Sequence, residues 1–222
     1  MNRSFRGLYA ITPDPGPDAT QRDDQRLVAA VALAIDGGAR LIQYRAKGLA
    51  QARRRTQAAA LAGVCAAAAV PLIINDDLEL ALAVGAAGVH LGRDDADPAA
   101  ARARLGAGAI IGVSCYDRLD LALAAVAAGA DYCAFGSFFA STVKPDAVRP
   151  APDLLTRARA RLTVPLVAIG GITPQNAGLL IAAGADLLAV ITGVFAAPDI
   201  AAAARAYSQL FEPGARPTET PR

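Results

Sequence analysis

The stretch Gly38-Ala39-Arg40-Leu41-Ile42-Gln43 links a helix-like segment to a short apolar run through a Gly-Ala pair. The same arrangement recurs three more times, with about 44 to 55 residues between successive glycines. Glycine commonly ends a helix by adopting a left-handed conformation, so each pair predicts a passage from helix to strand. The four pairs precede Leu41-Ile42-Gln43, Gly88-Val89-His90, Tyr132–Phe135 and Leu187–Val190.

Four further apolar runs lie between these repeats. They are continuous rather than alternating, which is typical of parallel strands that are buried on both faces. Eight strands that alternate with helical segments predict an α/β fold of the TIM (β/α)8 barrel type. An open doubly wound sheet is the alternative, but no GxGxxG motif follows the first run. The four further runs are Gly7–Thr12, Pro71–Asn75, Ile110–Ser114 and Pro165–Gly170.

The length of 222 residues and the hydrophobic content of 54% fit one large domain with a sizeable core. We expect residues 1–212 to form this single barrel. The proline-rich, polar tail 213–222 is predicted to be disordered. Residues 140–152 are predicted to form a long loop because they hold three prolines and mixed charge.

A net charge of +2, without a basic stripe, argues against a nucleic-acid partner. Three cysteines with no CxxC motif are typical of reduced thiols in a cytoplasmic protein. The N-terminus lacks the apolar core of a signal peptide. The longest apolar run, residues 58–74, is broken by Gly63 and Pro71, so we expect no membrane association.

Polar residues should gather at the carboxyl ends of the strands, where TIM barrels carry their chemistry. Gln43, Arg45 and Lys47 follow the second predicted strand and alternate toward the same side. Because unpaired cations are costly to bury, we expect Arg45 and Lys47 at the barrel mouth, where they suit a diphosphate. The alternative is an exposed loop with scattered charge.

Carboxylates follow the next two predicted strands. Asp76 and Asp95 would stand at the same end of adjacent strands, which is a plausible Mg²⁺ site beside substrate phosphate. Helix N-capping is the alternative role of such residues, and Asp77 and Asp97 fit it well. His90, the only histidine, is expected to be a structural residue with satisfied hydrogen bonds, and a catalytic acid or base is the alternative.

The remaining strand ends carry donors for anions. Ser114 can donate to phosphate, whereas Cys115 has no neighbouring base and is a weak candidate nucleophile. Glycines after the seventh and eighth predicted strands, before a short helix, match the backbone phosphate site of such barrels. Two anion sites on one barrel mouth predict two phosphorylated small-molecule substrates. Further donors are Ser141, Thr142 and Lys144.

The ordered set of motifs resembles the thiamine-phosphate synthase family, from the first predicted strand to the last. Each motif alone is weak, but their shared order is specific. The motifs are Gln43-x-Arg45-x-Lys47, Ile74-Asn75-Asp76, Gly88-Val89-His90-Leu91-Gly92-x-x-Asp95, Gly112-x-Ser114, Gly129-Ala130-Asp131-Tyr132, Phe135-Gly136 with Lys144, and Ala168-Ile169-Gly170-Gly171-Ile172.

The resemblance implies a transferase that joins 4-amino-2-methyl-5-(diphosphooxymethyl)pyrimidine to 4-methyl-5-(2-phosphoethyl)thiazole, or to its carboxylated form. It implies Mg²⁺ on Asp76 and Asp95, and it implies that the diphosphate leaves before the thiazole nitrogen attacks. The implied catalytic residues are Arg45, Lys47, Ser114 and Lys144. The implied substrate-binding residues are Gln43, Arg45, Lys47, Asn75, Ser114, Ser141, Thr142, Val143, Lys144, Gly171, Ile191 and Thr192.

Two positions depart from the family pattern. Arg93 stands where the family usually has Gln, and Val143 stands where a Thr-x-Thr-Lys type loop carries a hydroxyl. Both put the thiazole-side contacts in question but leave the metal and diphosphate ligands intact. The alternatives are a thiazole tautomerase-like relative, another phosphate-handling barrel isomerase or epimerase, and a silent barrel that senses a thiamine precursor.

Overall fold

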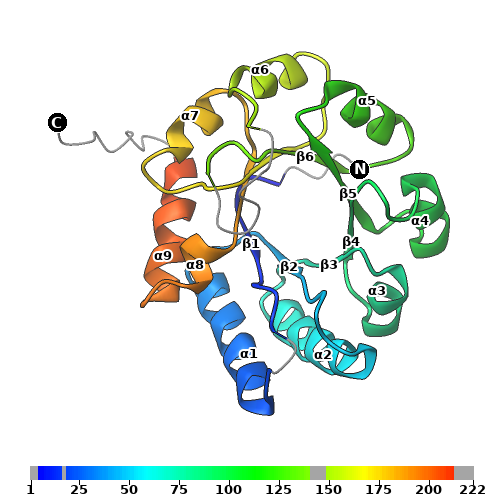
Figure 1. Cartoon of the computed structure of the whole chain (residues 1–222), viewed down its shortest axis with the longest axis vertical. Helices are drawn as coiled ribbons and strands as arrows, with labels where there is room; N and C mark the ends of the chain where they lie inside the picture. The colour runs from blue at the N-terminus through cyan, green and yellow to red at the C-terminus, as the bar shows by residue number, and fades with distance from the viewer. Residues whose placement is uncertain (1–4, 17–18, 141–148, 213–222) are drawn as a thin grey trace.

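A computed structural model describes residues 5–16, 19–140 and 149–212 of the chain. Within these ranges, eight parallel strands close into a barrel in the order β1-β2-β3-β4-β5-β6-β7-β8. Figure 1 shows the strands at the centre and the helices in a ring around them. The TIM barrel prediction is therefore confirmed, and the open doubly wound sheet is excluded.

Each strand coincides with one of the predicted apolar runs. β5 extends to Tyr116, beyond the predicted run, and its register against β6 shifts between Ser114 and Tyr116. The strands are β1 (Gly7–Ile11), β2 (Leu41–Tyr44), β3 (Leu72–Asn75), β4 (Gly88–Leu91), β5 (Ile110–Tyr116), β6 (Tyr132–Phe135), β7 (Leu166–Ile169) and β8 (Leu187–Val190).

Helices follow the strands around the barrel. After β8 come a short helix, α8, and then α9, which packs against α1 and β1. The helices are α1 (Gln21–Asp36), α2 (Gln51–Ala67), α3 (Leu78–Val84), α4 (Pro98–Leu105), α5 (Leu119–Ala127), α6 (Asp153–Arg159), α7 (Ala177–Ala182), α8 (Thr192–Phe195) and α9 (Ile200–Ser208), with a 3₁₀ turn at η1 (Gln209–Phe211).

The strands are buried on both faces, which explains their continuous apolar character. One set of side chains, including Tyr9, Ile73 and Tyr132, fills the barrel interior. The alternate set, including Leu8 and Ile42, packs outward against the helices. Several of the buried helical side chains in this outer layer are alanines, including Ala58, Ala122 and Ala204.

The repeated Gly-Ala-Asp segments build the amino-terminal end of the barrel. Gly129 and Gly184 have φ of 96° and 111°, a region that favours glycine, and so they end the preceding helices as predicted. The following Asp131 and Asp186 accept hydrogen bonds from strand backbone N–H groups at 2.8 Å and pair with Arg102 and Arg159. These two segments therefore tie the starts of β5 and β7 to α4 and α6.

Asp77 and Asp97 cap helices, as their positions predict. Asp77 accepts from the backbone N–H of Leu80 at the start of α3, and Asp97 accepts from Ala99 at the start of α4. In the ranges that the structure describes, no helix is both long and apolar enough to cross a membrane. The predicted tail 213–222 and residues 141–148 of the predicted loop lie outside the described residues.

Candidate active site at the barrel mouth

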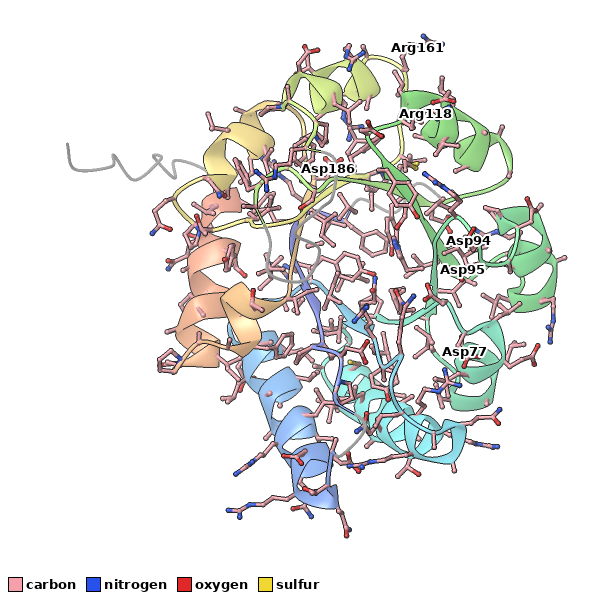
Figure 2. All side chains as sticks on the ribbon, in the orientation of Figure 1. Asp77, Asp94, Asp95, Arg118, Arg161 and Asp186 are labelled. Atoms are coloured by element: carbon pink, nitrogen blue, oxygen red, sulfur yellow. The ribbon has the colours of Figure 1, made fainter. Side chains whose placement is uncertain are left out.

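The carboxyl ends of β2, β3, β4 and β5 bring the predicted diphosphate and metal residues together. These strands are consecutive in the barrel, and Asn75 of β3 aligns with His90 of β4, which aligns with Gly112 of β5. Figure 2 labels Asp77 at the start of α3 and Asp95 after β4, on neighbouring strand ends. The local motifs thus converge on one side of the mouth.

Asp76 and Asp95 face each other and share a side-chain hydrogen bond. Burial and the adjacent Asp76 carboxyl raise the pKa of Asp95. Burial opposes ionisation of Asp76 too, but hydrogen bonds with Lys47 and Asp95 outweigh it and hold the pKa of Asp76 below its ordinary value. Two carboxyl groups this close favour a shared proton or a shared cation.

The ammonium of Lys47 reaches this carboxyl pair, with its Nζ 2.7 Å from Oδ2 of Asp76. Asp76 itself has a φ of 63°, a left-handed conformation that aspartate tolerates better than most residues. Its backbone N–H donates to the carbonyl of His90, which holds this turn against β4. Local backbone geometry therefore turns the Asp76 carboxylate toward Asp95 and Lys47.

The donor set fits Mg²⁺ better than a metal that needs a full protein cage. Mg²⁺ commonly takes one or two carboxylates and completes its octahedron with water and substrate phosphate. Among the described residues, no group of three or more His, Cys, Asp or Glu side chains is placed to hold a metal. Asp76 and Asp95 are the residues that could hold the ion.

Asp14, which sequence reasoning did not select, organises the loop after β2. Its Oδ2 accepts from Nη1 of Arg45 at 2.8 Å, and its Oδ1 accepts from the backbone N–H groups of Lys47 and Gly48 at 2.8 and 3.3 Å. Thr12 adds a hydrogen bond from the N–H of Arg45 to its Oγ1 at 2.9 Å. The signal in the sequence was the position of Asp14 just after the first strand, at the same end of the barrel.

An open pocket of about 320 Å³ lies beside these groups. Lys47, Asn75, Asp76 and Arg54 contribute to its wall. Arg54, from α2, pairs with Asp77 at 3.2 Å, and its Nε is the one buried side-chain nitrogen or oxygen of the described residues that lacks a hydrogen-bond partner. The pocket wall is therefore cationic on the α2 side and acidic on the β3 side.

A chain of hydrogen bonds crosses the barrel interior between two predicted substrate-binding residues. Gln43 Nε2 donates to the Tyr9 hydroxyl at 2.7 Å, and the hydroxyls of Tyr9 and Tyr132 lie 2.8 Å apart. His90 then bridges Tyr132 and Ser114, at 2.9 Å from Nδ1 and 2.8 Å from Nε2. Burial raises the pKa of both tyrosines, so they stay neutral. The expectation that His90 has satisfied hydrogen bonds is met.

Arg93, which departs from the family pattern, contacts Tyr116 in the structure. Its guanidinium lies 4.8 Å from the centre of the Tyr116 ring, and its backbone N–H donates to the Tyr116 hydroxyl at 3.3 Å. Tyr116 has a φ of 54° at the irregular end of β5, which carries its ring toward the loop after β4. The exposed Arg93 thus lies against Tyr116, two residues before Asp95 in the loop after β4.

Glycines bring the loops after β6 and β7 into close contact. A Cβ on Gly171 would stand 2.2 Å from the carbonyl oxygen of Ala140, and one on Gly170 would overlap the Ser137 side chain. The N–H groups of Phe138 and Phe139 donate to the carbonyls of Ile169 and Gly170, each at 3.0 Å. Ser141, Thr142, Val143 and Lys144, which continue this loop, lie outside the described residues.

The predicted short helix after β8 is present as α8. Ile191 precedes it and Thr192 begins it, both at least partly exposed, and the carbonyl of Ile191 accepts from Val194 and Phe195. Gly193 makes room for the Tyr207 hydroxyl, since a Cβ there would lie 2.3 Å from it. The segment can offer backbone N–H groups to a phosphate.

The three cysteines Cys65, Cys115 and Cys133 are free and buried. A hydrogen bond with Cys133 and burial raise the pKa of Cys115 strongly. Because the thiolate is the reactive form, this environment agrees with the weak nucleophile assignment of Cys115.

Comparison with known proteins places these features in a wider group. A family model described as thiamine monophosphate synthase matches residues 8–194. The chain is 56% identical over 211 residues to the thiamine-phosphate synthase of Azoarcus sp. (strain BH72), covering 95% of this chain and 100% of that one. It is 55% identical over 208 residues to that of Aromatoleum aromaticum, covering 94% and 97%.

Solved structures with the same barrel fold include one from a protein of the same kind. A thiamine phosphate pyrophosphorylase from Pyrococcus furiosus superposes with a TM-score of 0.79 at 31% identity, over 92% of this chain and 94% of that one. A structure described as native KDPGal has a TM-score of 0.68 at 19% identity, which shows the shared barrel fold alone.

Proposed function

The chain belongs to the thiamine monophosphate synthase family and has the transferase activity that forms thiamine phosphate; we propose that it does so by joining an aminopyrimidine methyl diphosphate to a thiazole phosphate with Mg²⁺. The proposed second substrate is 4-methyl-5-(2-phosphoethyl)thiazole or its carboxylated form. The metal would be held by Asp76 and Asp95. We further propose a cytoplasmic site of action, which the three free cysteines support.

The observation that carries the proposed substrates is the charge cluster at the ends of β2, β3 and β4. Arg45, Lys47, Asp76 and Asp95 stand at one side of the mouth, and each cation is held there by a carboxylate. An Mg²⁺-diphosphate matches both kinds of charge in this cluster, because its metal suits the carboxylates and its oxygens suit the cations. A simple phosphate would satisfy only part of this cluster.

The proposed reaction needs charge stabilisation more than proton transfer. The bond between the pyrimidine methylene carbon and the ester oxygen breaks, and its electron pair leaves on the diphosphate. The lone pair of the thiazole ring nitrogen then forms the new C–N bond. With the carboxylated thiazole, the carboxylate also leaves as CO₂. Arg45, Lys47 and Ser114 would donate to the leaving oxygens, and the bound metal would help neutralise their charge. Lys144 is proposed for the same role.

The thiazole phosphate would bind across the mouth. Gly171, Ile191 and Thr192 follow β7 and β8, opposite the carboxylates in the strand order, and can offer backbone N–H groups. Ser141, Thr142 and Val143 are proposed to complete this side. Asn75 and Gln43 would hold the pyrimidine beside the diphosphate groups. The two substrates would then meet over the barrel axis, in an orientation suited to attack.

The test is synthesis of thiamine phosphate from the two proposed substrates with Mg²⁺, followed as fluorescent thiochrome after oxidation. We expect product from the wild type, none with EDTA, and a loss of about 100-fold or more in kcat for Asp76→Ala, as for other key charge-stabilising groups. The matched control is Asp23→Ala, an exposed aspartate on α1 that also pairs with a cation. Turnover that survives both EDTA and Asp76→Ala would contradict the metal site.

The same assay separates the alternative functions. Folded protein that binds the thiazole phosphate but makes no product would favour a tautomerase-like or sensing role. In that case Val143→Thr would be the first variant to examine, because it restores a hydroxyl at the departing position.

A further inference from the structure

We propose that Tyr9, Tyr132 and His90 are positioning residues that fix the hydrogen-bonding polarity of Gln43 and Ser114 at the mouth. In this arrangement Ser114 presents its hydroxyl proton to the ligand, and Gln43 presents its carbonyl oxygen. The identity of the ligand rests on the proposed function, whereas the polarity of the chain rests on the structure of the barrel interior.

The direction of the chain follows from counting donors, beginning at Gln43. Its Nε2 can only donate, so the Tyr9 oxygen accepts this hydrogen bond. Tyr9 is 0% exposed, and its own hydroxyl proton needs an acceptor because an unpaired buried donor is costly. The acceptor within reach is the Tyr132 hydroxyl oxygen at 2.8 Å.

The same count continues to His90. Tyr132 is also 0% exposed, and it already accepts from Tyr9, so its proton goes to Nδ1 of His90 at 2.9 Å. A neutral imidazole whose Nδ1 accepts carries its proton on Nε2. Nε2 therefore donates to Oγ of Ser114 at 2.8 Å. All the hydrogen bonds from Gln43 to Ser114 therefore donate in the same direction, and this order selects the His90 tautomer with its proton on Nε2.

The two ends of the chain then have opposite character. Ser114 accepts from His90 and keeps its own O–H free to donate, which suits an anionic diphosphate oxygen. Gln43 uses an N–H on Tyr9, and no described residue donates to its Oε1, so this oxygen suits an amino group such as that of the pyrimidine. If the hydrogen bonds donated in the opposite direction, Ser114 would use its hydroxyl proton on His90, and Gln43 would use its carbonyl oxygen on Tyr9. Neither group would then be available to the ligand.

Packing in the barrel interior holds the residues of this hydrogen-bond network in place. A Cβ on Gly112 would lie 1.9 Å from the Tyr132 ring, so only glycine at this position of β5 lets the tyrosine cross the interior. The Tyr132 ring stacks on His90 with centroids 5.6 Å apart, and it meets Tyr9 edge-on at 5.8 Å. Packing therefore fixes all three rings, and little rotamer freedom remains for an alternative network.

His90 makes the proposal directly measurable because it is the only histidine in the chain. Tag-free protein with ¹⁵N-labelled histidine should give a single pair of ring nitrogen signals by NMR, without an assignment step. We expect Nε2 to show the protonated, pyrrole-type shift and Nδ1 the unprotonated, pyridine-type shift. A proton on Nδ1, or on both nitrogens, overturns the proposal.

Tyr132→Phe tests whether the chain sets the polarity at its far end. Without the Tyr132 hydroxyl, Nδ1 loses the donor that favours the imidazole proton on Nε2, and the Ser114 hydroxyl can turn inward to that nitrogen. We expect two tautomers in the NMR spectrum and a Kd for Mg²⁺ with inorganic diphosphate that rises about tenfold, as expected for one lost charge-assisted hydrogen bond. An unchanged tautomer with an unchanged Kd overturns the proposal.

Tyr44→Phe is the matched control. Tyr44 is another buried tyrosine of the barrel, and its hydroxyl donates to Gln57 at 2.7 Å on the helix side rather than in the interior. This variant removes the same atom and should leave both the tautomer and the diphosphate Kd unchanged. If Tyr132→Phe does not fold, the wild-type spectrum and Tyr9→Phe, one link earlier in the chain, still decide the matter.

These measurements separate this proposal from the proposed function. The tautomer is read without substrate, so a failure to make thiamine phosphate would leave it standing. Conversely, a histidine with the opposite tautomer would leave the synthesis assay unaffected.

Discussion

At the scale of single residues, the site depends on carboxylates that hold cations ready for an anionic ligand. Lys47 pairs with Asp76 and Arg45 pairs with Asp14 before any substrate is bound. Such pairing restrains long, flexible side chains, so less conformational entropy remains to be lost when a diphosphate binds. The mouth is therefore organised in advance for its ligand.

Asp14 should act through Arg45, and a double-mutant cycle can show it. We expect Arg45→Ala to lower kcat/KM by about 100-fold or more and Asp14→Ala to lower it by about tenfold. Because Asp14 positions Arg45 and the following backbone, the double variant should be little worse than Arg45→Ala alone. Steady-state kinetics of the four proteins provide the measurement.

The control for this cycle is the exposed pair Arg26 and Asp23 on α1, whose removal should leave kcat/KM unchanged. Fully additive losses for Asp14→Ala and Arg45→Ala would mean that Asp14 does not work through Arg45.

At the scale of elements, the two ends of each strand have different tasks. The carboxyl ends carry the charged site, whereas the Gly-Ala-Asp segments before β6 and β8 lock strand to helix at the opposite end. This division agrees with the general behaviour of TIM barrels, in which stability and chemistry lie at opposite faces. Variants at one end should therefore spare the property that depends on the other.

Asp131→Ala should lower stability without lowering activity. The change removes the acceptor of the Ile111 backbone N–H at 2.8 Å and of Arg102 at 2.5 Å, so we expect a loss of about 1–3 kcal/mol in the free energy of unfolding. Urea denaturation would measure this loss, and kcat/KM at low temperature should match the wild type.

Asp153→Ala is the matched control, since it removes an Asp–Arg pair that is exposed on α6 and should cost less than about 1 kcal/mol. Equal losses for the two variants would show that Asp131 is no more than a surface ion pair.

At the scale of the whole molecule, closure of the barrel couples the site to overall stability. Any ligand that binds only the folded state raises the free energy of unfolding, by about 2.7 kcal/mol when present at 100 times its Kd. The metal and diphosphate residues come from the ends of the four consecutive strands β2 to β5, so unfolding must disperse all of them.

Mg²⁺ together with inorganic diphosphate should therefore raise the Tm of the wild type by several degrees, roughly 2–4 °C for each kcal/mol. Calorimetry or dye-based melting would measure the shift, which EDTA should reverse and Asp76→Ala should abolish. A similar rise in wild type and Asp76→Ala would argue that diphosphate binds without the carboxylate pair.

The sequence by itself determined the strands, their order and the residues at their ends. Parallel strands buried on both faces must be continuously apolar, and glycine must end the helices before them, so these features are written locally. The helix caps Asp77 and Asp97 follow from local rules too. The nearness of Lys47, Asp76 and Asp95 followed once the barrel was recognised, because neighbouring strand ends meet.

Only the tertiary structure decided which side chains bond across the barrel. Tyr9 and Tyr132 are 123 positions apart, and Asp14 and Arg45 are 31 apart, so no local period records either contact. The tyrosines occupy interior positions that an apolar side chain would fill equally well in a strand pattern. Their pairing with His90 depends on barrel closure and on the space left by Gly112, and both arise only when distant strands pack together.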